Sequence, residues 1–158
     1  MSNYCTANDI LNRVDLYELF QRVSGSLTVL TEAALSDKIQ GNDMTGYSAG
    51  IQAEATTALA RIDVRITDAT GVINSYLGGK YTLPMLLEFQ PLISYCVDIS
   101  VYYLYQSVLS EGDMVFVRYT QAMAWLKDVS SGKISLGLDT TDTTVTSSSG
   151  GITYPGLA

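Results

Sequence analysis

The stretch Asn74-Ser75-Tyr76-Leu77-Gly78-Gly79-Lys80-Tyr81-Thr82-Leu83-Pro84 decides the fold of this chain. Its first residues complete an amphipathic helical pattern, and the pair Gly78-Gly79 is predicted to end that helix through backbone conformations with positive φ. Pro84 disfavours a new helix directly before it. The stretch therefore predicts a sharp reversal, with Tyr76 and Leu77 in the core. We expect Gly79→Val to impair folding.

The segment before the reversal carries the most regular pattern in the sequence. Over residues 51–77, eight apolar residues step by three or four positions and share one stripe of a helix of about seven turns: Ile51, Ala55, Leu59, Ile62, Ile66, Ala69, Ile73 and Leu77. Val64 and Val72 lie off this stripe, and Gly71 costs a helix interior about 1 kcal/mol relative to alanine. Either a second partner surface explains these three residues, or the valines are ordinary exposed residues and the glycine marks a mild bend.

Two more helices are predicted after the reversal. Pro91 suits the first turn of a helix over residues 92–109 that is apolar on most sides, so it is either the central helix of a bundle or a subunit interface. Asp98 lies in its middle and is expected to pair with Arg118 or Lys80, or to share a polar edge with Ser94. Asp113 is a good N-cap for the last helix, whose apolar stripe is Val115, Tyr119, Ala122, Leu126 and Val129.

Short helices are predicted in the N-terminal third of the chain. Thr6 and Asp9 have the spacing of a capping box, and the apolar residues that follow belong either to one bent helix or to two short helices joined near Asp15. Ser24-Gly25-Ser26 ends this pattern. Residues 27–30 are expected to be extended, and Thr31 is expected to cap a short helix over residues 31–39.

The end of the chain has a different composition. Residues 133–138 alternate polar and apolar side chains like a short strand or an extended arm, and residues 139–158 are rich in Thr, Ser and Gly and cannot form a core alone. We predict an all-α fold, a small helical bundle built on one long helix and two further core helices, in residues 1–138. Residues 139–158 are predicted to form an extended C-terminal arm. Apolar residues near and in this arm are the candidates for binding a neighbouring chain: Ile134, Leu136, Leu138, Val145, Ile152, Tyr154, Pro155 and Leu157.

Length, charge and hydropathy limit the class of protein. A chain of 158 residues with 47% hydrophobic content forms one domain, and 16 acidic against 9 basic residues disfavour binding to nucleic acid. An acidic wall does suit a channel through which DNA slides without sticking. No secretory signal precedes the first helix, and the charge of Asp98 favours a buried core helix over a membrane span for residues 92–109.

The sequence offers little chemistry. It has no histidine, and its two cysteines, Cys5 and Cys96, are expected to be separate reduced thiols and not a disulfide framework. Gly78-Gly79-Lys80 resembles a fragment of a phosphate-binding loop, but it follows a helix and does not lead from a strand into one. No catalytic, cofactor or metal site is predicted. The tyrosines of residues 92–109 either line a ligand groove or pack at a helix interface.

Three blocks of the sequence together resemble the helical head-tail joining proteins of Mu-like tailed phages and prophages. The first block holds Tyr4-Cys5-Thr6, Asp9-Ile10 and Arg13-Val14, and the second runs over residues 73–81 with Leu83-Pro84. The third holds Tyr119, residues 124–128 and residues 132–137. The resemblance covers most of residues 4–139 and leaves out the Thr/Ser-rich arm.

The resemblance implies a virion protein at the neck, assembled in the host cytoplasm into a ring of twelve copies. Such an adaptor docks on the portal protein, extends the DNA channel without sequence-specific binding, and receives a stopper or tail terminator as the next component. Subunit-interface candidates are Val64, Val72, Tyr102 and Tyr105. The alternatives are another neck or tail-completion ring protein, or a small helical ligand-binding protein or enzyme. No cofactor and no membrane partner are expected.

Overall fold

The computed structural model describes residues 2–25, 29–83, 90–105 and 107–137. Within these ranges the chain forms no β-strand and six α-helices: α1 (Ala7–Leu11), α2 (Leu16–Val23), α3 (Glu32–Gln40), α4 (Ala49–Leu77), α5 (Gln90–Tyr105) and α6 (Met114–Ser131). The predicted all-α class is confirmed.

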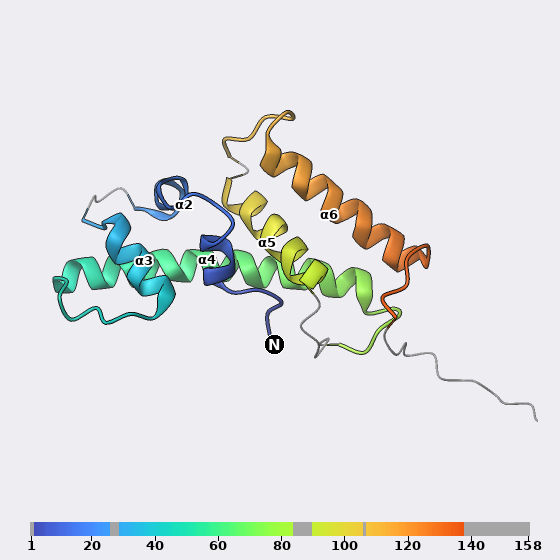
Figure 1. The fold of residues 1–158 in the computed structure, drawn as a ribbon, viewed down its shortest axis with the longest axis horizontal. Coiled ribbons are helices and arrows are strands. Elements are labelled where there is room, and N and C mark those ends of the chain that lie inside the picture. The colour runs from blue at the N-terminus through green and yellow to red at the C-terminus, as the bar shows by residue number, and fades with distance from the viewer. Residues whose placement is uncertain (1, 26–28, 84–89, 106, 138–158) are drawn as a thin grey trace, which may run out of the picture.

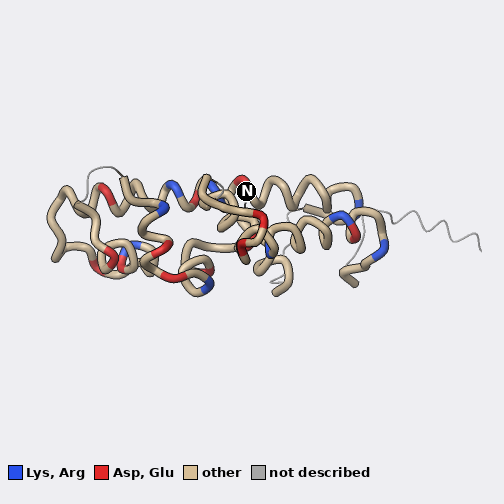
Figure 2. The backbone as a smooth tube through the Cα atoms, turned by 90° about the horizontal axis from the view of Figure 1, so that it is seen from above, with Lys and Arg blue, Asp and Glu red and all other residues tan. Residues whose placement is uncertain are grey.

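Helix α4 is the scaffold of the molecule. Its 29 residues correspond to a length of about 43 Å. Helices α2 and α3 lie along its N-terminal part, α1 lies near its middle, and α5 crosses its C-terminal part with α6 packed on the far side of α5 (Figure 1). Seen from above, the molecule is much longer than it is wide (Figure 2).

The apolar stripe predicted for α4 faces the other helices. Ile51 and Leu59 are half-buried, and the remaining six residues of the stripe are buried: Ala55, Ile62, Ile66, Ala69, Ile73 and Leu77. Burial of one continuous stripe on a long helix is what allows short helices on both halves to share a single core.

The starts of the short helices follow their capping residues. The Asp9 backbone N–H donates to Thr6 Oγ1 at 3.2 Å, and the Thr6 N–H donates back to Asp9 Oδ2 at 2.8 Å, which confirms the capping box. Asp15 accepts from the first turn of α2, so the apolar residues near it belong to two helices and not one. Thr31 caps α3 as predicted. The segment expected to be extended, residues 27–30, lies partly outside the described residues.

The reversal after α4 forms by a different mechanism from the one predicted. Gly78 is right-handed, with φ −62°, and Gly79 is not among the described glycines with positive φ, which are Gly41, Gly132 and Gly137. The backbone turns because the N–H groups of Lys80 and Tyr81 both donate to the Leu77 carbonyl, at 2.9 and 3.0 Å. The prediction of positive φ at the pair Gly78-Gly79 is therefore wrong.

At the reversal, the space for a side chain is tight at Gly78 and not at Gly79. A Cβ atom at Gly78 would lie 3.0 Å from the Asn74 carbonyl oxygen and 3.3 Å from Leu83 Cδ1. A Cβ at Gly79 would meet nothing within 4 Å. The sensitivity predicted for Gly79→Val is therefore not supported, and it belongs to position 78. As expected, Leu77 is buried, and Tyr76 packs partly buried against the core. Pro84 and residues 85–89 lie outside the described residues.

Helix α5 is the central helix, packed against α4, α6, α1 and α2. It ends at Tyr105 and not at residue 109, and Val108 beyond it is 52% exposed. Asp113 is the N-cap of α6, and Gly132 ends α6 with φ 82°. Residues 133–137 form no β-strand, which excludes the first of the two forms expected for residues 133–138 and leaves the extended arm. In the part of the chain that the structure describes, no helix combines the length and the apolar character needed to cross a membrane.

Candidate functional site

One line of positions on the side of α4 that faces away from the buried stripe carries no charge, although Asp63 and Asp68 are exposed beside it. We call it the outer face of α4 and define it by seven exposed residues at spacings of three and four: Ala53, Thr57, Ala60, Val64, Thr67, Gly71 and Ser75. It extends for about 33 Å along the helix. Val64 is 54% exposed, and a Cβ atom at Gly71 would meet nothing within 4 Å. No contact among the described residues therefore explains the glycine.

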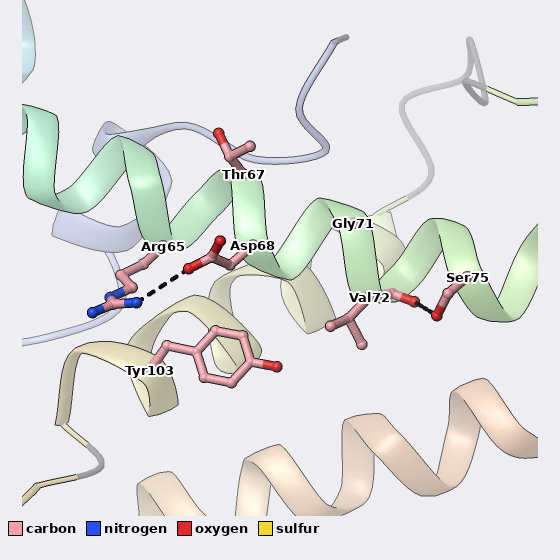
Figure 3. Close-up of a pocket in the computed structure, with 7 residues that line it drawn as sticks. All are labelled: Arg65, Thr67, Asp68, Gly71, Val72, Ser75 and Tyr103. Carbon is pink, nitrogen blue, oxygen red and sulfur yellow. Dashed lines mark hydrogen bonds and ion pairs between the residues drawn. The ribbon is translucent and has the colours of Figure 1, made fainter.

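A groove of about 650 Å³ runs beside the outer face (Figure 3). Tyr103 of α5 extends below α4 toward Val72, and the other lining residues are Arg65, Thr67, Asp68, Gly71 and Ser75. Arg65 Nη1 and Asp68 Oδ2 form an ion pair of 3.1 Å at the rim. Burial, reinforced by neighbouring tyrosines and Asp68, raises the pKa of Tyr103, so its hydroxyl stays protonated and polar in the groove.

The groove adjoins a smaller hollow with basic walls. It has a volume of about 220 Å³ and is lined by Arg22, Arg61, Val64, Arg65, Tyr103 and Leu104. Three arginines gather there although the chain has a net charge of −7. The hollow and the groove share Arg65 and Tyr103, so the two form one continuous surface beside α4.

Three of the four tyrosines of α5 contact aromatic residues of α6. Tyr102 stacks on Tyr119 with ring centroids 3.8 Å apart, Tyr103 and Phe116 flank this pair, and Tyr95 contacts Trp125 at 4.7 Å. These contacts favour the helix-interface explanation of the tyrosines over a ligand groove. The role of Tyr102 in a contact between subunits stays a prediction.

Tyr105 points in another direction, toward α2. It is 6% exposed, the Arg22 guanidinium lies 5.5 Å from its ring centroid, and its hydroxyl has no hydrogen-bond partner among the described residues. Burial raises the pKa of Tyr105 to about 12. The chain itself already covers most of this side chain, so little of it is available to the neighbouring subunit that was expected to contact it.

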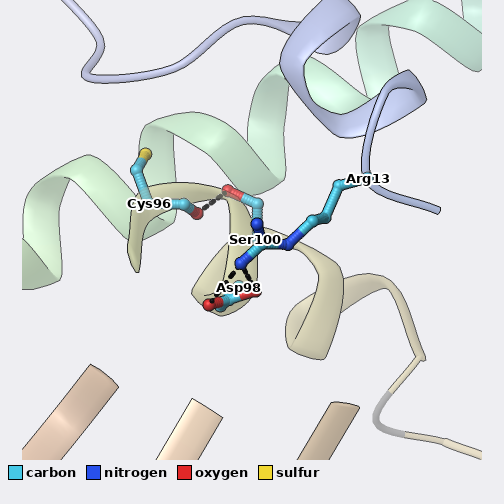
Figure 4. A network of polar contacts seen from close by, with 4 residues as sticks. All are labelled: Arg13, Cys96, Asp98 and Ser100. Carbon is cyan, nitrogen blue, oxygen red and sulfur yellow. Dashed lines mark hydrogen bonds and ion pairs between the residues drawn. The ribbon is translucent and has the colours of Figure 1, made fainter. Parts of the chain in front are cut away.

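Asp98 pairs with a residue that the sequence did not indicate. Arg13, in the connection between α1 and α2, places Nη2 at 3.3 Å from both carboxylate oxygens of Asp98 (Figure 4). The expected partners, Arg118 and Lys80, are therefore wrong, although the charge of Arg118 does act on Asp98 from a distance. Burial raises the pKa of Asp98, and the charge and hydrogen bond of Arg13 oppose this rise. The pair ties the N-terminal helices to α5.

The two cysteines lie in direct contact. Cys5 Sγ and Cys96 Sγ are 2.9 Å apart, both side chains are buried, and both are free thiols. The contact with Cys96 and burial raise the pKa of the Cys5 thiol well above its usual range. The free state was predicted, but the contact was not, because 91 residues separate the two positions. Elsewhere in the described residues, no three His, Cys, Asp or Glu side chains gather in a group that could hold a metal ion.

Only the beginning of the predicted binding arm is described. Ile134 and Leu136 pack half-buried against the core, and the Leu136 N–H donates to the Tyr81 hydroxyl at 3.1 Å. This bond fixes the chain beside the reversal after α4. The other arm candidates lie outside the described residues: Leu138, Val145, Ile152, Tyr154, Pro155 and Leu157.

Comparison with known proteins identifies the family. The sequence profile described as "Bacteriophage Mu, Gp36" matches residues 4–154. The Mu-like prophage FluMu protein gp36 of Haemophilus influenzae is 36% identical over 91 residues, which cover 58% of this chain and 63% of that protein. The matched stretch thus spans less than two thirds of this relative. Because the profile covers nearly the whole chain, the expected membership is confirmed, and the chain belongs to the bacteriophage Mu gp36 family.

Proposed function

We propose that this protein is a structural component of the virion, a head-tail adaptor that forms a ring of twelve copies in the neck. In this proposal the ring docks on the portal protein, extends the channel for DNA and receives the next neck or tail component. The protein acts by assembly and not by catalysis. Membership of a phage protein family and the surface beside α4 support the proposal.

The observation that carries the proposal is the outer face of α4. An exposed helix face usually carries charged side chains, yet none of the chain's 25 charged residues, 16 acidic and 9 basic, occupies these seven positions. Small uncharged side chains allow another backbone to approach closely. Gly71 destabilises the isolated helix by about 1 kcal/mol relative to alanine, and packing by a neighbour would offset that cost.

The occupant that we assign to this face is a second copy of the chain. The basic hollow of Arg22, Arg61 and Arg65 lies beside the face, whereas the chain as a whole is acidic. A neighbouring copy therefore offers carboxylates that complement the hollow. Because the α4 face and the acidic surface that it meets are different parts of the chain, the contact is heterologous, and repeating it around an axis closes a ring.

The charge of the chain suits a channel for DNA. A net charge of −7 repels phosphate, so DNA could move past a ring of these subunits without being held. Binding of DNA would instead require a clustered basic surface much larger than the hollow of three arginines.

Two matched variants test the assembly surface. Val64 and Val108 are 54% and 52% exposed, so aspartate at either site adds the same charge at the same exposure. We expect Val64→Asp to remain a folded monomer that fails to form rings, and Val108→Asp to form rings like the wild type. Native mass spectrometry gives the copy number, and circular dichroism checks the helix content. If Val64→Asp forms rings, or if both variants lose them, the outer face of α4 is not the contact surface between subunits.

Deletion of residues 139–158 tests the portal contact. We expect the shortened chain to fold and to form rings but to lose co-sedimentation with portal rings, because the arm carries most of the apolar residues proposed to bind the portal. Equal co-sedimentation of the shortened and intact chains would show that the arm is not the portal anchor. Binding to another neck or tail ring in place of the portal would favour a tail-completion role.

A further inference from the structure

The thiol pair has a geometry that independent core cysteines do not need. Cys5 Sγ and Cys96 Sγ lie 2.9 Å apart. A disulfide requires an S–S distance of about 2.05 Å, so the two sulfur atoms need to approach each other by less than about 1 Å. Cys96 belongs to the central helix α5, and its sulfur points away from the Asp98 carboxylate (Figure 4). Bond formation between the sulfurs therefore leaves the Arg13–Asp98 pair in place.

The backbone on the Cys5 side is well suited to a small adjustment. Cys5 lies before the first helix, directly before the N-cap Thr6. The Tyr4 N–H donates to Thr70 Oγ1 at 3.4 Å, and the Tyr4 hydroxyl donates to Asn74 Oδ1 at 2.6 Å. A small movement of this non-helical segment would bring Cys5 toward Cys96 without distorting a helix. Because both thiols are buried, their oxidation requires that this segment open transiently.

We propose that Cys5 and Cys96 form an intramolecular disulfide in the folded protein when it meets an oxidising environment. The pair is then a redox site whose thiols stay reduced in a reducing cytoplasm and form the disulfide outside the cell, where disulfides persist on virion surfaces. The proposal depends on the geometry of one chain, so it holds whether or not the protein forms a ring.

The reaction is thiol-disulfide exchange with a small-molecule disulfide such as oxidised glutathione. The Cys96 thiol, whose pKa is lowered by its contact with Cys5, attacks as the thiolate one sulfur of the oxidant and releases one glutathione thiolate, which leaves a mixed disulfide on Cys96. The Cys5 thiolate then attacks the Cys96 sulfur, forms the S–S bond and releases the second glutathione thiolate. Two protein thiols are oxidised, one disulfide is reduced to two thiols, and the two protons end on the released glutathione.

The cross-link would fasten the N-terminal segment to the centre of the bundle. It joins the residues before α1 to α5 and closes a loop of 91 residues. A loop of this length restricts the unfolded chain strongly, so we expect oxidation to raise the melting temperature by roughly 10 °C.

The test uses the full chain, purified in the reduced state and then incubated with oxidised glutathione below its melting temperature. We expect the intact mass to fall by two hydrogen atoms, maleimide to label no thiol after denaturation, and the peptides of Cys5 and Cys96 to be joined in a non-reducing digest. Melting curves of reduced and oxidised protein measure the stabilisation. Cys5→Ser and Cys96→Ser are the controls, and reduced melting curves confirm that each folds.

The outcomes separate the proposal from ordinary thiol reactivity. Each serine variant should keep its reduced melting temperature in the oxidant and should never lose two hydrogen atoms. If the wild-type protein keeps two free thiols, carries only glutathione adducts or forms disulfides between chains, the proposal is refuted. A serine variant that gains the same stability in the oxidant would also refute it.

Discussion

Removal of the Arg13 side chain is predicted to destabilise the fold through Asp98. Asp98 is 8% exposed, and the Arg13 guanidinium is the group that compensates its charge at 3.3 Å from both oxygens. Breaking a fully buried pair by removing one partner costs about 3–5 kcal/mol, and exposed pairs contribute about 0–1 kcal/mol. Because the Arg13 side chain is 41% exposed, an intermediate loss of about 2 kcal/mol is expected for Arg13→Ala.

The matched variant Asp98→Asn removes the charge that needs compensation. Burial raises the pKa of Asp98 even with Arg13 present, so the ionised carboxylate is not favoured by its surroundings. The asparagine carbonyl still accepts a hydrogen bond from Arg13. We therefore expect Asp98→Asn to cost less than about 1 kcal/mol, and the addition of Arg13→Ala to it to cost little more.

The pH dependence follows from the sign of the shift. The folded-state pKa of Asp98 lies above its ordinary value of 3.8, so the folded chain binds this proton more tightly than the unfolded chain. The resulting stabilisation is fully present below pH 3.8 and is lost as the pH rises through the raised folded-state pKa. Loss of Arg13 raises that pKa further. The loss in the free energy of unfolding caused by Arg13→Ala should therefore be largest at neutral pH and should become smaller as the pH falls.

Urea unfolding followed by circular dichroism, at several pH values, measures all four chains of this double-mutant cycle. A destabilisation of about 2 kcal/mol corresponds to a lower melting temperature by roughly 4–8 °C for a chain of this size. An equal cost of Arg13→Ala in the Asp98→Asn background and in the wild-type protein would show that Arg13 does not act through the charge of Asp98. A cost of Arg13→Ala that does not depend on pH would show the same.

Two further predictions concern stability. Gly79→Ala should raise the free energy of unfolding by about 0.4–1 kcal/mol, because the site is open and its φ is not positive. Gly78→Val should lower the free energy of unfolding, because the Cβ atom of valine would press on the Asn74 carbonyl. Equal effects of the two variants in urea unfolding would contradict this account. Tyr105→Phe should raise the melting temperature, because it removes a buried hydroxyl without a partner among the described residues, which costs about 1–3 kcal/mol. A lower melting temperature would indicate that the hydroxyl is bonded.

The helical elements could be predicted because their signals are local, and the family could be predicted from the order of three blocks spread along the chain. The spacing of eight apolar residues predicts the stripe of α4, and the caps at Thr6 and Thr31 depend only on groups within three residues of them. Errors occurred where a local signal had two explanations. Gly78-Gly79 is compatible with a left-handed turn and with a crowded right-handed one, and the apolar residues after Tyr105 continue a helical pattern that the chain leaves.

The candidate surfaces were predicted only in part. Val64 and Val72 stood out because they lie off the apolar stripe, and both are now placed, Val64 on the outer face of α4 and Val72 in the groove beside it. The basic hollow was missed. Arg22 belongs to α2, whereas Arg61 and Arg65 belong to α4, and no spacing in the sequence indicates that these helices bring them together.

The sequence by itself determined the elements of this protein: a 29-residue helix with one apolar stripe, short capped helices before it, and an apolar helix after it. Tertiary structure alone decided how distant residues meet, namely Arg13 with Asp98 and Cys5 with Cys96. The physical reason is that caps and periodicity depend on neighbours within one or two turns of helix. The partner of a buried charge or thiol depends on how helices pack, and that packing is set by the whole core at once. The reversal at Asn74 to Leu83 depends on both: the crowding at Gly78 comes first from the carbonyl of Asn74 in the preceding turn of the helix and second from the side chain of Leu83, which the fold brings back against it.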